Sequence, residues 1–344
     1  MRNDGYQNSS CLVITLDFEL HWGVAGKVPG SEHPYWSNLL GARKAVSRLL
    51  ELFQERDIHA TWATVGKLFA RGRDDLEGFA PQVLQQCESK SAGASRLSLG
   101  SSEEEDPLHF APGMIQQILA APGQELACHT FCHYSCDEPG PDVHFFKADL
   151  EAAQAIAERD GVRLRSLVFP RNQILSSYLP VLPEAGIEAY RGNPPKGMYH
   201  LPASGPGRYA VRAFRLLDSY VNLSGHHLVP WSSITAEYPY NVRASRFLRP
   251  YSRKLKALEP LRRRRVVQGL RAAAKRNRIF HLWWHPHNFG AEPEANLAGL
   301  EAILDEFEQL REKRGMRSLN MGGVLDCIGI GEDSWEEWPT NEHE

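Results

Sequence analysis

The chain has 344 residues, of which 42% are hydrophobic and 24% charged, and its formal net charge is −3. This balance is typical of a globular protein with a large core, and it gives the whole molecule no general attraction to nucleic acid. No apolar run approaches the roughly 18 residues of a membrane-spanning helix, and the length suits one α/β barrel domain over residues 1–344.

The predicted elements alternate between short apolar strands and amphipathic helices. The sequence indicates strands at 12–16, 60–65, 125–130, 164–169 and 279–284, and helices at 39–56, 113–120, 147–159 and 296–313. Such alternation is typical of βαβ units that build a parallel sheet.

Two segments interrupt this pattern. Residues 89–107 are rich in Ser, Gly and Glu and are predicted to be a surface insertion. Residues 243–278 hold fourteen Lys or Arg against one acidic residue, Glu259, and are predicted to be a basic helical insertion. The basic segment is either a solvated helix face or a binding surface for an anionic partner.

The N-terminus and the cysteines favour the cytoplasm. The first ten residues, MRNDGYQNSS, lack the apolar core of a signal peptide, and six cysteines form no secreted disulfide framework in a chain of this length. Cys128, Cys132 and Cys136 lack the usual spacing of zinc or iron–sulfur ligands, and we interpret them as small buried residues.

The first polar cluster follows the first apolar run. Asp17 and Glu19 end that predicted strand, and because strand side chains alternate in direction, both carboxylates point the same way while Phe18 turns to the core. Neighbouring carboxylates repel each other unless a cation lies between them or one holds a proton. The pair is therefore a candidate metal or acid–base site, with a solvated loop or an arginine ion pair as the structural alternative.

A second cluster, His129-Thr-Phe-Cys-His133, follows another predicted strand. If the segment forms one helical turn, both imidazoles lie on one face, an arrangement that other enzymes use to bind zinc. Two imidazoles and a carboxylate make a three-ligand zinc site with one open position. A histidine pair alone is more often structural, but a carboxylate pair at a neighbouring strand end favours the metal site.

A third cluster, His281-Leu-Trp-Trp-His285-Pro-His287, ends the strand at 279–284. His285 is predicted to project at the strand end as a proton donor, whereas His281 fits a buried core histidine better. Trp283 and Trp284 either form a sugar-binding surface or fill the core.

These three clusters, in this order, resemble the polysaccharide deacetylase (NodB-homology, carbohydrate esterase 4-like) family. Thr15-Leu-Asp17-Phe-Glu19 is similar to its first motif in the D-x-E form of atypical members, His129-Thr-Phe-Cys-His133 matches its H-[ST]-x-x-H motif, and Trp284-His285-Pro286 is similar to its late histidine motif. The resemblance covers residues 11 to 330. It implies a distorted (β/α) barrel of about seven parallel strands.

The resemblance also implies roles for these residues. Glu19, His129 and His133 would bind a divalent ion, with Zn²⁺ favoured over Co²⁺, Ni²⁺ or Fe²⁺. Asp17 would be the catalytic base and His285 the acid. The ion would polarise an amide carbonyl and activate a water molecule.

The assignments of five further residues are less direct. The family motif places Arg before Pro, whereas Pro170-Arg171 reverses that order here; we still assign Arg171 to orient the base. Asp218 is our candidate for the carboxylate that tunes the histidine. We expect Trp22, Asn172 and Trp284 to line the substrate site.

The implied function is removal of an N-acetyl group from a sugar in bacterial surface-polysaccharide biosynthesis. A non-catalytic carbohydrate- or metal-binding relative, and a hydrolase of a formyl group or cyclic amide, remain alternatives. A cytoplasmic enzyme does not meet an extracellular polymer, so the sugar is expected to be linked to a nucleotide or a lipid diphosphate. The basic segment 243–278 would then bind that anion or contact an anionic inner membrane peripherally.

Overall fold

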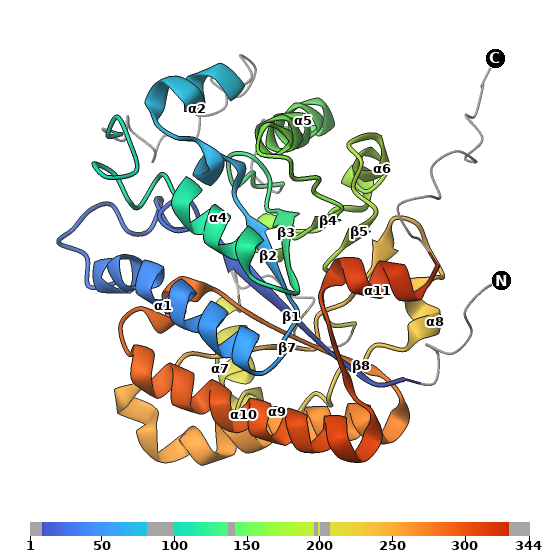
Figure 1. The fold of residues 1–344 in the computed structure, drawn as a ribbon. Helices are drawn as coiled ribbons and strands as arrows, with labels where there is room; N and C mark the ends of the chain where they lie inside the picture. Colours follow the sequence, from blue (N-terminus) through green and yellow to red (C-terminus); the bar gives the residue numbers. More distant parts are fainter. Residues whose placement is uncertain (1–8, 81–98, 137–141, 196–198, 200–206, 330–344) are drawn as a thin grey trace, which may run out of the picture.

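The computed structural model describes residues 9–80, 99–136, 142–195, 199 and 207–329. In this part of the chain nine strands form one curled parallel sheet in the order β6-β5-β4-β3-β2-β1-β8-β7, and β9 also pairs with β1 (Figure 1). The strands are β1 (Cys11–Phe18), β2 (Ala60–Thr64), β3 (Gln124–Cys128), β4 (Ser166–Leu167), β5 (Ala189–Tyr190), β6 (Tyr240–Asn241), β7 (Arg246–Phe247), β8 (Ile279–Trp284) and β9 (Arg317–Leu319).

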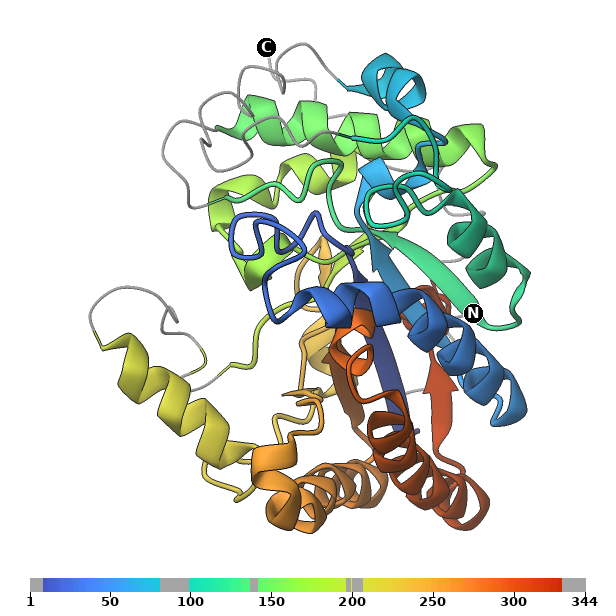
Figure 2. The same ribbon diagram turned by 90° about the vertical axis from the view of Figure 1, so that its left-hand side faces the viewer.

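Helices cover the sheet (Figure 2), and several of the connections between strands and helices contain short 3-10 turns. The α-helices are α1 (Trp36–Glu55), α2 (Arg73–Phe79), α4 (Pro112–Ala120), α5 (Val143–Arg159), α6 (Val181–Glu184), α7 (Arg208–Asp218), α8 (Trp231–Ile234), α9 (Glu259–Arg276), α10 (Pro293–Arg314) and α11 (Met321–Cys327). The 3-10 turns are η2 (Gly66–Phe69), η3 (Pro170–Asn172), η4 (Ser176–Tyr178), η6 (Arg253–Leu258) and η7 (Pro286–Phe289).

The predicted fold class, an α/β barrel of parallel strands, is confirmed. The structure has nine strands in its described residues where the resemblance implied about seven, because several strands have only two or three residues and leave no periodic signal. The strand expected at 164–169 is one of these short strands and covers only Ser166–Leu167. The barrel is also open, since no pairing joins β6 to β7 among the described residues.

Strand β1 lies at the centre of the sheet and is buried over its whole length. Leu12, Ile14 and Leu16 belong to the main core, which includes the inner faces of α1 and α10. The alternate residues point to the concave side, where Val13 packs with a smaller core that includes α11 residues. Thr15 and Asp17 share that alternate register, so the strand itself directs them into the interior of the half-barrel.

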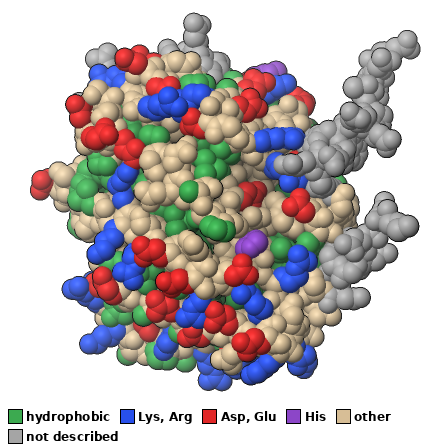
Figure 3. Space-filling model, viewed as in Figure 1, with side chains coloured by type: hydrophobic (Ala, Val, Ile, Leu, Met, Phe, Trp, Pro, Cys, Tyr) green, Lys and Arg blue, Asp and Glu red, His purple; other side chains and the backbone are tan. Residues whose placement is uncertain are grey.

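The basic segment is partly internal. Arg246, Arg262 and Arg265 are buried, and α9 packs against α10 and β8. Figure 3 shows acidic and basic side chains interspersed over the lower part of this face of the molecule. Arg271 of α9 pairs with Glu306 of α10. The expected basic insertion is therefore an integral layer of the fold, with only some of its cations exposed.

The expected surface insertion at 89–107 is described only in part. Residues 89–98 lie outside the described residues, while 99–107 form turns in which Glu103 accepts a hydrogen bond from Arg43. No helix in the described ranges is long and apolar enough to cross a membrane.

Candidate metal centre and active site

The carboxyl ends of β1, β3 and β8 meet at one edge of the sheet. Leu16 of β1 pairs with Trp284 of β8, so the next residues along each strand, Asp17 and His285, lie at the same level. On the other side of β1, strand β2 connects it in register to Cys128 of β3, and His129 follows directly. Parallel pairing thus brings together residues that are far apart in the sequence.

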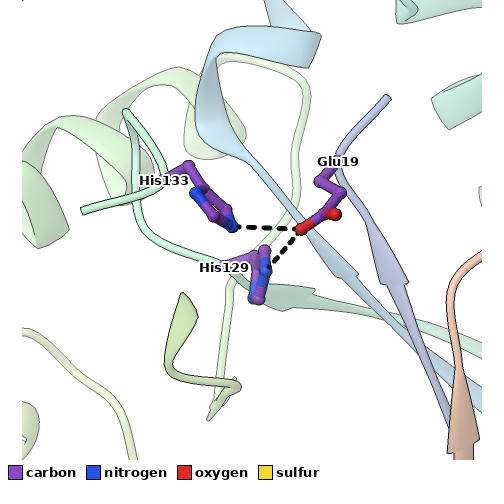
Figure 4. Close-up of side chains that lie close together, drawn as sticks. All are labelled: Glu19, His129 and His133. Atoms are coloured by element: carbon purple, nitrogen blue, oxygen red, sulfur yellow. Dashed lines mark hydrogen bonds and ion pairs between the residues drawn. The ribbon is translucent and has the colours of Figure 1, made fainter. Parts of the chain in front are cut away.

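Glu19 and the two histidines of the second cluster form a buried triad (Figure 4). Oε2 of Glu19 lies 3.3 Å from Nε2 of His129 and 3.0 Å from Nε2 of His133. These three side chains are almost wholly buried. The structure therefore brings together the three residues that the sequence indicated as metal ligands.

The sequence analysis considered a helical turn through His129 and His133, but the structure has none there. Thr130 and His133 have positive φ values of 61° and 57°, and the segment is an irregular loop. Asp149 of α5 fixes this loop, because its carboxylate accepts the backbone N–H groups of Phe131 at 2.5 Å and Cys132 at 3.0 Å. The missed signal was Asp149, an acidic residue on the buried face of a predicted helix.

The orientation of His129 fits a metal ligand. Its Nδ1 donates a hydrogen bond to the carbonyl of Val168 at 2.8 Å, which leaves Nε2 facing Glu19 at 3.3 Å. Ligand histidines in metal sites are usually oriented through their second nitrogen in this way. Two imidazoles and one carboxylate, with ligand atoms within 4.8 Å of one another, suit Zn²⁺ or a related divalent ion.

Gly23 leaves room for the Glu19 carboxylate. A Cβ atom on Gly23 would lie only 1.9 Å from Cδ of Glu19, so any side chain there displaces the carboxylate. This close approach explains why residue 23, four positions after Glu19, is a glycine. The sequence alone did not reveal this requirement.

Electrostatics favour the ionised form of Glu19. Burial raises its pKa, but the charge of His285 and the hydrogen bonds from His129 and His133 outweigh burial and hold the pKa well below its ordinary value. Burial lowers the pKa of His133, against the opposing pull of Glu19. A charged carboxylate beside a neutral imidazole is the protonation state that a divalent ion requires.

Arg191, which the sequence analysis missed, holds Asp17. Its guanidinium donates to both carboxylate oxygens of Asp17 at 2.6 and 2.8 Å, and both side chains are buried. Burial raises the pKa of Asp17, but Arg191 more than offsets this and the pKa lies below its ordinary value. Arg191 follows the two-residue strand β5, which was too short to predict.

Arg171 does not occupy this position. It is exposed, has a positive φ of 55°, and donates to the hydroxyl of Ser135 at 3.1 Å. Its neighbour Asn172 does approach the base, because its Oδ1 accepts a hydrogen bond from Arg191 at 2.9 Å. The order Pro-Arg places Arg171 at the loop surface, and Arg191 contacts Asp17 instead.

A chain of buried hydrogen bonds extends from Asp17 to the next layer of the barrel. Arg191 also donates to the hydroxyl of Thr15 at 2.9 Å, and Thr15 lies 3.0 Å from Nε2 of His281. His281 in turn contacts the carbonyl of Val242 at 3.0 Å through Nδ1. His281 is thus the buried core histidine that the sequence predicted, with burial lowering its pKa to about 3.

His285 lies between the two carboxylates at the strand ends. Its Nε2 is 3.7 Å from Oδ2 of Asp17 and 3.6 Å from Oε1 of Glu19, and the side chain is partly exposed. Its Nδ1 lies 3.3 Å from Oδ1 of Asn288, which is fixed by a 2.8 Å hydrogen bond to Tyr35. The geometry therefore places His285 close to both Asp17 and Glu19 and leaves it partly open to solvent.

Asp218 lies in a separate cluster. Its carboxylate pairs with Arg246 at 3.1 Å and Arg265 at 3.4 Å, and it accepts a hydrogen bond from Tyr199 at 2.8 Å. These contacts hold α7 against α9. Among the described residues, no contact joins Asp218 to His285. The expectation that Asp218 tunes His285 is replaced by a structural role.

The tryptophans differ from expectation in one respect. Trp284 is completely buried and stacks on Phe289, so it belongs to the core and cannot contact a substrate. Trp283 is only partly buried, and the two rings of Trp283 and His285 lie 5.7 Å apart. Because strand side chains alternate in direction, Trp283 rather than Trp284 lies beside His285. Trp22 is partly exposed, with the ammonium of Lys67 4.5 Å from its ring.

No protein-family model and no curated protein matches the sequence. Solved structures do match over nearly the whole chain. A protein from Mycobacterium smegmatis assigned to the polysaccharide deacetylases superposes with a TM-score of 0.58 at 14% identity, covering 93% of this chain and 91% of that one. This chain has the fold of the polysaccharide deacetylases.

Other chemistries also use this deacetylase-type fold. The allantoinase Puue matches with a TM-score of 0.53 at 12% identity, covering 93% of this chain and 90% of that one. A GH57-type branching enzyme from Pyrococcus horikoshii matches with a TM-score of 0.50 at 14% identity, covering 92% and 70%. The function must therefore be argued from the site rather than from the fold.

Proposed function

We propose that this chain is a metal-dependent amide hydrolase that removes an N-acetyl group from a sugar in bacterial surface-polysaccharide biosynthesis. The observation that carries the proposal is the buried triad of Glu19, His129 and His133 beside Asp17 and His285. Three metal ligands next to a carboxylate and an imidazole provide the metal activation and the acid–base groups that a hydrolase needs to cleave an unactivated amide.

Glu19, His129 and His133 would hold the ion, which when bound polarises the amide carbonyl and makes water a better nucleophile at neutral pH. Zn²⁺ suits these ligands best, and Co²⁺, Ni²⁺ and Fe²⁺ prefer similar donors. The hydrogen bond from His129 to the Val168 carbonyl fixes the ligand nitrogen, so the triad is preorganised.

Asp17 would act as the base. Arg191 keeps the Asp17 carboxylate ionised and fixes both of its oxygens, so it is ready to accept a proton from the attacking water. His285 would donate a proton to the leaving amine, because its Nε2 faces the carboxylates while its ring remains partly exposed. The two groups thus divide the acid and base tasks.

Trp283, whose ring lies 5.7 Å from that of His285, is partly exposed and is a candidate contact for a sugar ring. Trp283 takes the place that the sequence analysis gave to Trp284, and Trp22 and Asn172 remain candidate substrate contacts. Aromatic faces bind the apolar faces of pyranose rings through dispersion, while amides and hydroxyls provide orientation.

The anionic carrier of the sugar is a further part of the proposal. Arg253, Lys254 and Lys256 of η6 are exposed, as are the neighbouring side chains of Leu258 and Leu261 at 37% and 41%. Cations next to exposed apolar groups suit a lipid diphosphate at an anionic membrane surface. Sedimentation with anionic and neutral vesicles at low and high salt tests this: binding to neither vesicle would exclude the membrane, leaving a nucleotide-linked sugar.

A second candidate is hydrolysis of a cyclic amide, which the shared fold of an allantoinase favours. The two functions are separated by incubating the zinc-loaded protein with N-acetyl and N-formyl sugar nucleotides, lipid-linked sugars and cyclic amides. Release of acetate supports the proposal, release of formate assigns the other acyl group, and ring opening supports the second candidate.

Asp17→Asn is the matched control for that panel. It keeps the size of the side chain and leaves the three metal ligands in place, so it should bind metal but release no acyl group. Bound metal in the parent protein without turnover of any substrate would favour a non-catalytic binding protein instead.

A further inference from the structure

The two oxygens of the Glu19 carboxylate face different histidine pairs. Oε2 lies 3.3 and 3.0 Å from His129 and His133. Oε1 points the other way and lies 3.6 Å from Nε2 of His285 and 3.9 Å from Nε2 of His287. Glu19 therefore stands between two potential ligand sets.

The second set has the dimensions of a metal site. The ligand atoms of Glu19, His285 and His287 all lie within 4.8 Å of one another. Zinc bonds to imidazole and carboxylate are about 2.0–2.2 Å long, so tetrahedral ligand atoms lie roughly 3.5 Å apart. The two distances from Oε1 are close to this value.

The side chain of Asn288 orients the His285 imidazole, and His287 lies buried beside it. Nδ1 of His285 faces Oδ1 of Asn288, as Nδ1 of His129 faces a backbone carbonyl in the first set. His287 is 3% exposed, and within the described residues its ring makes no hydrogen bond. Its Nε2 instead faces Oε1 of Glu19, the arrangement expected of a metal ligand.

We propose that Glu19 bridges two metal sites, and that Glu19, His285 and His287 bind a second, weaker divalent ion such as Zn²⁺. Carboxylates bridge ions that lie about 3.5–4 Å apart in two-metal enzymes. The second ion binds more weakly, since His285 is partly exposed and the bridging carboxylate already neutralises part of the first ion's charge.

The second ion acts as an inhibitor, a consequence that depends on the proposed function. Binding occupies the Nε2 lone pair of His285, and that nitrogen then cannot carry the proton for the leaving amine. General acid catalysis typically contributes about 10²–10⁴-fold to a rate, so filling the second site should lower acyl release about a hundredfold or more. One equivalent of metal activates the protein, and excess metal inhibits it.

The test is a titration of the metal-free full chain with Zn²⁺, followed by elemental analysis and calorimetry, with Co²⁺ absorption as an independent readout. We expect two bound ions of unequal affinity and loss of activity as the second site fills. His287→Ala should bind one ion and resist inhibition by excess Zn²⁺. His59→Ala, a change at an exposed histidine at the opposite end of β2, should still bind two.

Different failures lead to different conclusions. Saturation of the parent protein at one ion, or a His287→Ala protein that still binds two, would overturn the second site and leave the proposed function intact. Two bound ions without acyl release at any metal loading would support the second site and overturn the proposed function instead.

Discussion

Replacing Arg191 with methionine should show that Asp17 depends on a single buried partner. Arg191 donates to both oxygens of Asp17, and neither side chain has appreciable solvent contact. Arg191→Met keeps an apolar stem of similar length but leaves the Asp17 carboxylate buried without its hydrogen-bond donor, with only His285 nearby at 3.7 Å. Breaking a buried pair from one side typically costs about 3–5 kcal/mol of unfolding free energy.

A double variant, Arg191→Met with Asp17→Asn, separates the effect of the buried Asp17 charge from that of the lost Arg191 side chain. Adding Asp17→Asn removes the stranded negative charge, so the double variant should be more stable than the sum of the two single effects, by about 1–3 kcal/mol. Urea unfolding at pH 7 measures all four proteins. Arg171→Met is the control at an exposed arginine, for which a change within roughly 0.5 kcal/mol is expected.

Additivity within about 0.5 kcal/mol would refute the assignment, because it would mean that Arg191 and Asp17 do not interact in solution. A cost at Arg171 equal to that at Arg191 would also contradict it, since the sequence-based assignment of the orienting arginine would then stand.

Three further changes test other parts of the site. Gly23→Ala should weaken metal binding about 10–100-fold by displacing the carboxylate beneath it, whereas Gly26→Ala, where a Cβ meets nothing within 4 Å, should not; equal dissociation constants would refute the packing argument. His281 has a pKa near 3 when folded and 6.5 when unfolded, so its contribution to stability is complete above pH 6.5 and declines as the pH falls toward 3, by at most roughly 5 kcal/mol. Urea midpoints should therefore fall less with acidification in His281→Gln than in the parent, and parallel curves would contradict this. Trp284→Ala should cost about 3–5 kcal/mol of stability, whereas Trp283→Ala should mainly raise KM; the reverse pattern would restore the original assignment.

The sequence predicted the parts of the site that lie on long strands. Cys11–Phe18 and Ile279–Trp284 carry clear apolar runs, so Asp17, Glu19 and His285 could be placed at strand ends. His129 and His133 could be recognised as a pair, although the strained loop that presents them could not, since it is fixed by a remote carboxylate rather than by local propensity.

The rest depended on contacts between distant residues. Arg191 follows a two-residue strand, and its pairing with Asp17 spans 174 positions of the chain, so no local pattern identifies it. Asp218 is the sequence-based candidate for the partner of the histidine, but in the structure two arginines of the basic segment pair with it. The choice between Trp283 and Trp284 depended on which face of β8 is covered, which alternation alone leaves open.

The most direct test of the central claim is the metal content of the purified full chain and of His133→Ala after both are loaded with Zn²⁺ and passed through a desalting column. We predict about one tightly held ion per chain in the parent protein and almost none in the variant, because His133 is one of three ligands. A parent protein that retains no ion, or a His133→Ala protein that retains as much as the parent, would contradict the proposed metal centre.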